Sequence, residues 1–176
     1  MRTFALLATA AMFGAGAAMA QTSSESTSGT ATASVNSPQE FVEKAAISNM
    51  FEIQSSELAL EMSENEDIQA FAEQMVEDHT AAGEELKAAV EAQGGDLQVP
   101  TELDTKHQDM IDQLSSASGE EFDQMYVEMQ TQAHEQAVSL FESYAENGEG
   151  ELQAFAEATL PTLQEHYEMI QQMGQQ

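Results

Sequence analysis

The sequence contains no cysteine and no tryptophan, and only three prolines occur among its 176 residues. Because cysteine is missing, disulfides cannot stabilise the fold, and stability must come from the packing of a core. Basic residues are also scarce: four lysines and arginines stand against 32 aspartates and glutamates, which gives a formal net charge of −28. A surface of this charge repels nucleic acid and anionic membranes, so no nucleic-acid partner is expected.

Long apolar runs are missing after the first 20 residues. Residues 1–20 read MRTFALLATAAMFGAGAAMA, with one positive charge at Arg2 and small residues at Ala18 and Ala20. This pattern is typical of a signal peptide cleaved before Gln21, and its apolar part is too short and too rich in glycine and alanine for a membrane anchor. We therefore predict an exported protein, periplasmic or secreted, with no transmembrane anchor after cleavage.

The rest of the chain divides into a polar segment and one domain. Residues 21–36 are rich in serine, threonine, glycine and alanine, which predicts a flexible tether because so little apolar surface can be buried. In residues 37–174, apolar side chains recur three and four apart over 37–62, 66–93, 118–147 and 150–173, as in helices with one buried face. S-x-x-E patterns at Ser37 and Ser118 predict capping boxes at two helix starts.

The same periodicity assigns a buried face to each helix. In the second and last helices, His79 and His166 fall on the buried face, whereas Glu52 flanks the face of the first helix and His134 lies off the centre of the third. The face predicted for the first helix is Val42, Ala45, Ala46, Asn49, Met50, Ile53 and Leu60. The face predicted for the third helix is Phe122, Tyr126, Met129, Ala133, Ala137, Leu140 and Tyr144.

The lengths of the connections predict how the helices are arranged. Short loops join the first helix to the second and the third to the last, so each pair forms a hairpin. Residues 94–117 form a longer connection with a short helix at about 102–114, long enough to run the length of a bundle. Two hairpins joined by such a crossover make an all-α, ferritin-like four-helix bundle.

Four residues stand near the middle of the four long helices: Glu52, His79, His134 and His166. In an antiparallel bundle, mid-helix positions share one level, so these residues are expected to form a central layer. Imidazole and carboxylate together suit a transition metal such as iron, zinc or copper. The alternative is a buried polar layer in which the histidines are hydrogen-bonded to Glu52, Gln130, Tyr126 or water.

A dinuclear carboxylate centre is disfavoured by the residues around the histidines. Such bundles carry Glu-x-x-His on two helices. Here Val76 and Leu163 stand three residues before His79 and His166, so the bridging carboxylates are missing. A mononuclear site is therefore the form that a metal centre would take.

Three short runs resemble a known family. MVEDH at residues 75–79, SGEEFDQMY at 118–126 and LPTLQEH at 160–166 occur in the order and spacing of the domain-of-unknown-function 4142 family. The resemblance covers residues 38–173. It implies an exported bacterial protein with a ferritin-like bundle, often labelled an outer membrane protein, and it implies no reaction.

The sequence favours a binding protein over an enzyme. It contains no glycine-rich phosphate loop, no nucleophile elbow and no HExxH pattern. We expect an exported helical bundle that acts as a binding or envelope-stress module, with a protein partner that the sequence does not identify. The alternative is a mononuclear metal-binding bundle that uses Glu52, His79, His134 and His166.

Overall fold

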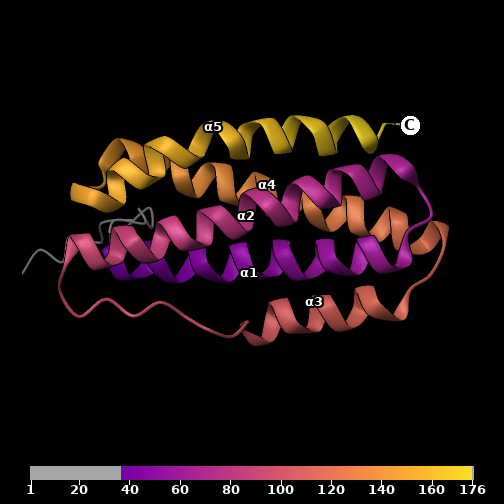
Figure 1. Ribbon diagram of the computed structural model, residues 1–176, viewed down its shortest axis with the longest axis horizontal. Helices are drawn as coiled ribbons and strands as arrows, with labels where there is room; N and C mark the ends of the chain where they lie inside the picture. The colour runs from indigo at the N-terminus through magenta and orange to yellow at the C-terminus, as the bar shows by residue number, and fades with distance from the viewer. Residues whose placement is uncertain (1–36, 176) are drawn as a thin grey trace, which may run out of the picture. The chain divides into compact units, whose positions relative to one another are not determined.

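The computed structural model describes residues 37–175, and they form five helices and no strand. The helices are α1 (Pro38–Met62), α2 (Glu66–Gln93), α3 (Thr105–Ser116), α4 (Glu120–Asn147) and α5 (Gly150–Met173) (Figure 1). The predicted all-α class is confirmed. The predicted signal peptide (1–20) and tether (21–36) lie outside the described residues.

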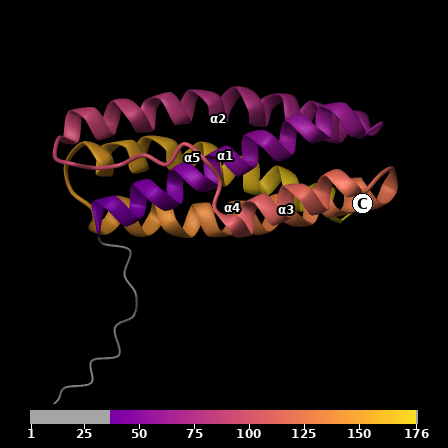
Figure 2. The ribbon, with the colours of Figure 1, turned by 90° about the horizontal axis from the view of Figure 1, so that it is seen from below.

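The four long helices pack side by side, and α3 lies outside them. α1 packs against α2, α4 against α5, α2 against α5 and α1 against α4, so each long helix has two neighbours. α2 and α4 run in the same direction because the segment between them, which includes α3, returns along the bundle (Figure 1). α3 contacts α1 and α4 on the outside of the bundle (Figure 2).

Side-chain capping explains where two helices start, and the predicted caps of two other helices are missing. The Asn65 side chain accepts a hydrogen bond from the backbone N–H of Asp67 at 2.9 Å and so starts α2. Asp104 does the same for α3 through the N–H of His107 at 2.8 Å, which places the start of α3 later than predicted. The predicted capping boxes are wrong: neither α1 nor α4 has a side-chain cap, and α4 begins after Gly119 with φ +59°.

The predicted burial of His79 in α2 and of His166 in α5 agrees with the structure, whereas the predicted buried faces of α1 and α4 are shifted. In α4, His134 and Phe141 are buried, whereas the predicted Ala133 and Leu140 are only partly buried. In α1, the predicted Met50 is partly buried, and the positions that face the bundle carry several polar side chains. The buried residues of α1 are Phe41, Val42, Ala45, Ala46, Phe51, Glu52, Ser55, Ser56 and Ala59.

The core consists of two apolar clusters. One contains Phe41, Phe141, Tyr144 and Phe155, in which the Phe41 and Tyr144 rings are stacked with their centroids 3.9 Å apart. The other contains the side chains of Phe71, Met75, Leu114, Phe122, Tyr126 and Ile170, among others. No helix in residues 37–175 is both long enough and apolar enough to cross a membrane.

Candidate metal centre

The central layer combines one polar side chain from each long helix. α1 supplies Glu52, α2 His79, α4 His134 and α5 His166, and none of the four is more than 3% exposed. None of them belongs to either apolar cluster. The prediction that Glu52 flanks the buried face and that His134 lies off its centre is therefore wrong, since both side chains point into the bundle.

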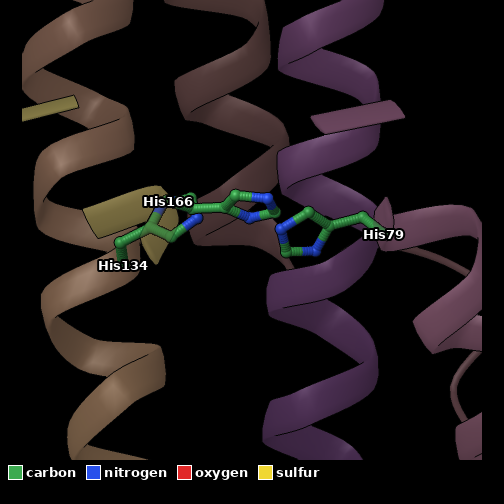
Figure 3. A group of neighbouring side chains, drawn as sticks. All are labelled: His79, His134 and His166. Carbon is green, nitrogen blue, oxygen red and sulfur yellow. The ribbon is translucent and has the colours of Figure 1, made fainter. Parts of the chain in front are cut away.

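The three histidine rings meet in the bundle interior. One ring nitrogen from each of His79, His134 and His166 lies within 4.8 Å of the other two. The ring centroids are 5.5–5.7 Å apart. Ring nitrogens point toward the space between the rings (Figure 3). A tetrahedral ion with metal–nitrogen bonds of about 2.0–2.1 Å needs nitrogens about 3.3 Å apart, so small ring movements would complete such a site.

Each ring is held by an oxygen on one side. His134 Nδ1 lies 2.9 Å from the backbone carbonyl of Gln130, and His166 Nε2 lies 2.9 Å from Asp78 Oδ2. His79 Nδ1 lies 3.1 Å from Asn49 Oδ1. Carbonyl and carboxylate oxygens can only accept, so these three ring nitrogens carry the protons and donate.

The opposite nitrogen of each ring is free. Within residues 37–175, His79 Nε2, His134 Nε2 and His166 Nδ1 are buried and have no hydrogen-bond partner. Because the protons are on the other nitrogens, these three carry lone pairs. Buried polar atoms are normally satisfied, and metal-binding histidines characteristically donate their second nitrogen to an oxygen.

Glu52 lies beside the histidines but outside the group of three nitrogens. Its Oε2 is 3.3 Å from His79 Nδ1, and its Oε1 is 3.6 Å from His134 Nδ1. Ser48 Oγ is 3.5 Å from Oε2, which is long for a hydrogen bond. The carboxyl group therefore contacts the ring edges that carry protons, where a negative charge would be favourable.

The family assignment follows from the sequence. The model of the family described as a domain of unknown function, DUF4142, matches residues 21–173. The chain belongs to the DUF4142 family. This confirms the family indicated by the three short runs. No curated protein matches the DUF4142 chain significantly.

Two solved structures share the fold of the DUF4142 chain. CopM in the Cu(II)-bound form aligns with a TM-score of 0.64 and 20% identity, over 78% of this chain and 95% of CopM. A secreted DUF305 protein from Streptomyces coelicolor aligns with a TM-score of 0.62 and 9% identity, over 74% of this chain and 85% of that protein. At these identities the likeness concerns the fold alone.

Burial sets the protonation states in the DUF4142 site. Removal from water is the main cause that lowers the pKa of His134 to about 4 and that of His79 well below its ordinary value. Neighbouring histidines contribute to both shifts, and the hydrogen bond to the Gln130 carbonyl partly opposes the shift of His134. The same desolvation raises the pKa of Glu52 from 4.5 to about 8. At neutral pH, therefore, the rings of His79 and His134 are neutral and can offer lone pairs to a cation.

A second polar network crosses the DUF4142 bundle near this site. Gln130 donates from its side-chain amide to Ser55 Oγ at 2.7 Å, and the hydroxyls of Ser56 and Tyr126 are 2.9 Å apart. The alternative of a buried polar layer offered Tyr126 as a hydrogen-bond partner of the histidines. In the structure Tyr126 is hydrogen-bonded to Ser56 instead.

Sequence reasoning missed two side chains that hold the rings, Asn49 and Asp78. Asp78 directly precedes His79, and an aspartate beside a buried position reads as a surface residue. It is 35% exposed, but its carboxylate reaches inward to His166. His107, the remaining histidine, is partly buried against Phe51, with 5.5 Å between the ring centroids, and it lies outside the central layer.

Proposed function

We propose that this protein binds one transition-metal ion in the central layer, with His79, His134 and His166 as ligands. The observation that carries the proposal is the arrangement of the ring nitrogens. One nitrogen of each ring is held by an oxygen, and the other is buried without a partner among the described residues. The rings also converge, since one nitrogen of each lies within 4.8 Å of one nitrogen of the other two, so the three histidines form a preorganised set of ligands.

Glu52 would provide the negative charge that such a site needs. A divalent ion surrounded by three neutral imidazoles is a buried charge, and burying a charge without a counter-charge is costly. The Glu52 carboxyl is 1% exposed and within 3.6 Å of two of the rings. It would ionise when the metal binds and orient His79 and His134 through the ring nitrogens that carry their protons.

Copper is the metal that we propose first. Imidazole nitrogens bind zinc, copper, iron and nickel, and divalent copper binds most tightly among the first-row ions at a given nitrogen site. The shared fold with CopM in the Cu(II)-bound form supports this order of preference. Zinc and iron are the other ions that the same ligands would accept.

The proposal extends to the architecture and the location of the protein. The two hairpins and the crossover that joins them would be the ferritin-like arrangement of a four-helix bundle. With the predicted signal peptide, the protein would be exported and would act in the periplasm or outside the cell as a metal-binding module, or as a module that responds to envelope stress.

The test is the metal content of the full chain, expressed with its own N-terminal region, recovered after export and loaded separately with copper, zinc and iron. We expect about one equivalent of bound copper and nitrogen hyperfine splitting in its EPR spectrum. His79→Gln, His134→Gln and His166→Gln should each lose most of this metal.

His107→Gln is the matched control, because it makes the same substitution outside the central layer. It should bind copper like the wild type. A wild-type protein that takes up none of the three metals would contradict the proposal, and the histidines would then form a structural polar layer. Equal losses in His107→Gln and His79→Gln would contradict it as well.

A further inference from the structure

A cavity of about 20 Å³ lies directly beside the central layer. All four long helices line it, and Glu52 and His79 form part of its wall. A single buried water needs about 10–15 Å³ of such space, so the cavity holds a water or a ligand only slightly larger. Most of the remaining wall is apolar and comes from the first cluster, including Ala45, Leu86 and Phe141.

Besides His79 Nε2, two polar atoms of the residues that line the cavity lack partners. Thr159 Oγ1 and Glu52 Oε1 are buried, and nothing in residues 37–175 forms a hydrogen bond with either. A threonine within a helix commonly bonds to the carbonyl of the preceding turn, as Thr131 does to Val127 at 2.7 Å. The Thr159 hydroxyl makes no such bond, so it is available to a molecule in the cavity.

We propose that this cavity binds a small exogenous ligand at an open coordination position of the metal, water at rest and a small monoanion in exchange. The inference rests on the proposed metal site and adds the class of molecule that the site would take. Thr159 would donate a hydrogen bond to the ligand, His79 would hold the metal at the cavity edge, and the apolar wall would exclude larger anions.

The charges in the bundle interior favour a monoanion. A divalent ion bound by three imidazoles brings two positive charges into the bundle, and Glu52 is the one carboxyl group of the central layer that could balance one of them. Asp78, the other carboxylate that contacts a ring, is 35% exposed, so solvent screens much of its charge. A singly charged ligand would neutralise the buried site, whereas a second negative charge would again leave it unbalanced.

The experiment is a titration of the copper-loaded full chain with azide, followed by its charge-transfer absorption and by the EPR spectrum. We expect saturable binding of one azide per copper. Thr159→Val keeps the shape of the side chain and removes the hydroxyl, so it should weaken azide binding about tenfold or more, as for other hydrogen bonds to charged groups. Thr131→Val is the matched control and should leave azide affinity unchanged.

The second variant fills the cavity. Ala45→Leu places three further carbons at the wall and should abolish azide binding while about one equivalent of copper stays bound. Ala133→Leu makes the same change beside the other apolar cluster and should bind azide normally. Circular dichroism identifies a variant that has not folded, and Thr159→Val then decides the question by itself.

The outcomes separate the two proposals. If the wild type holds copper but azide changes neither spectrum, or if Thr159→Val binds azide as tightly as the wild type does, the cavity inference is overturned and the metal site remains. If the wild type takes up neither copper, zinc nor iron, both are overturned.

Discussion

Glu52→Gln tests the physical account of the central layer without any metal. Glutamine has nearly the shape of the neutral acid and cannot ionise. Burial raises the pKa of Glu52 from 4.5 in the unfolded chain to about 8 in the folded protein. Below pH 4.5 the carboxyl is neutral in both states, so the folded protein then has the full stability associated with this group.

The sign of the pH dependence follows from proton binding. As the pH rises above 4.5, the unfolded chain loses its proton, whereas the folded protein keeps it until about pH 8. The free energy of unfolding therefore falls across this window, by at most about 1.4 kcal/mol per pH unit. A shift from 4.5 to about 8 corresponds to a total loss of roughly 5 kcal/mol, to be taken as an order of magnitude.

The assay is urea denaturation at pH values from 5 to 9 with a chelator present. Wild type and Glu52→Gln should have similar stability at pH 5, and the variant should become the more stable one above pH 8, by several kcal/mol. Glu57→Gln on the exposed side of the same helix is the control and should follow the wild type. Parallel curves for Glu52→Gln and the wild type would refute the reasoning.

Three further predictions concern side chains around the site and the core. Asp78→Asn should lower copper affinity by roughly 10–100-fold in a competition titration, because the carboxylate orients its histidine, whereas Glu77→Gln next to it should have no effect. Leu114→Ala should reduce the free energy of unfolding by about 2–5 kcal/mol in urea, because this fully buried side chain joins α3 to the core. Tyr126→Phe should cost about 1–3 kcal/mol by leaving the buried Ser56 hydroxyl unpaired, and an unchanged urea midpoint would contradict the bond.

The sequence determined the helices well wherever the apolar pattern was unambiguous. The predicted bounds of the second and last helices, 66–93 and 150–173, are those of α2 and α5. Large apolar side chains such as Phe71 and Leu163 recur at regular spacing on one face of each helix. Few other rotations of the helix about its axis would bury all of them. The lengths of the connections also predicted the two hairpins. A loop of two or three residues is so short that the helices it joins must pack antiparallel to each other.

The sequence could not determine the rotation of α1 and α4. Both helices offer apolar side chains on more than one face, so a hydropathy pattern alone chooses the more apolar side. In the structure that choice fails at Glu52 and His134, which are polar and yet buried. Each of these polar side chains can be buried in the bundle only because side chains from other helices surround it.

The sequence therefore identified the residues of the candidate site, and the tertiary structure determined their geometry. Mid-helix spacing placed Glu52, His79, His134 and His166 at one level, since each residue adds about 1.5 Å along a helix. Which nitrogen of each ring is free depends on Asn49, the Gln130 carbonyl and Asp78. A hydrogen bond to one of these oxygens depends on distance and direction, which a sequence pattern does not contain. Only the packing of the four helices therefore determines what the histidines are able to bind.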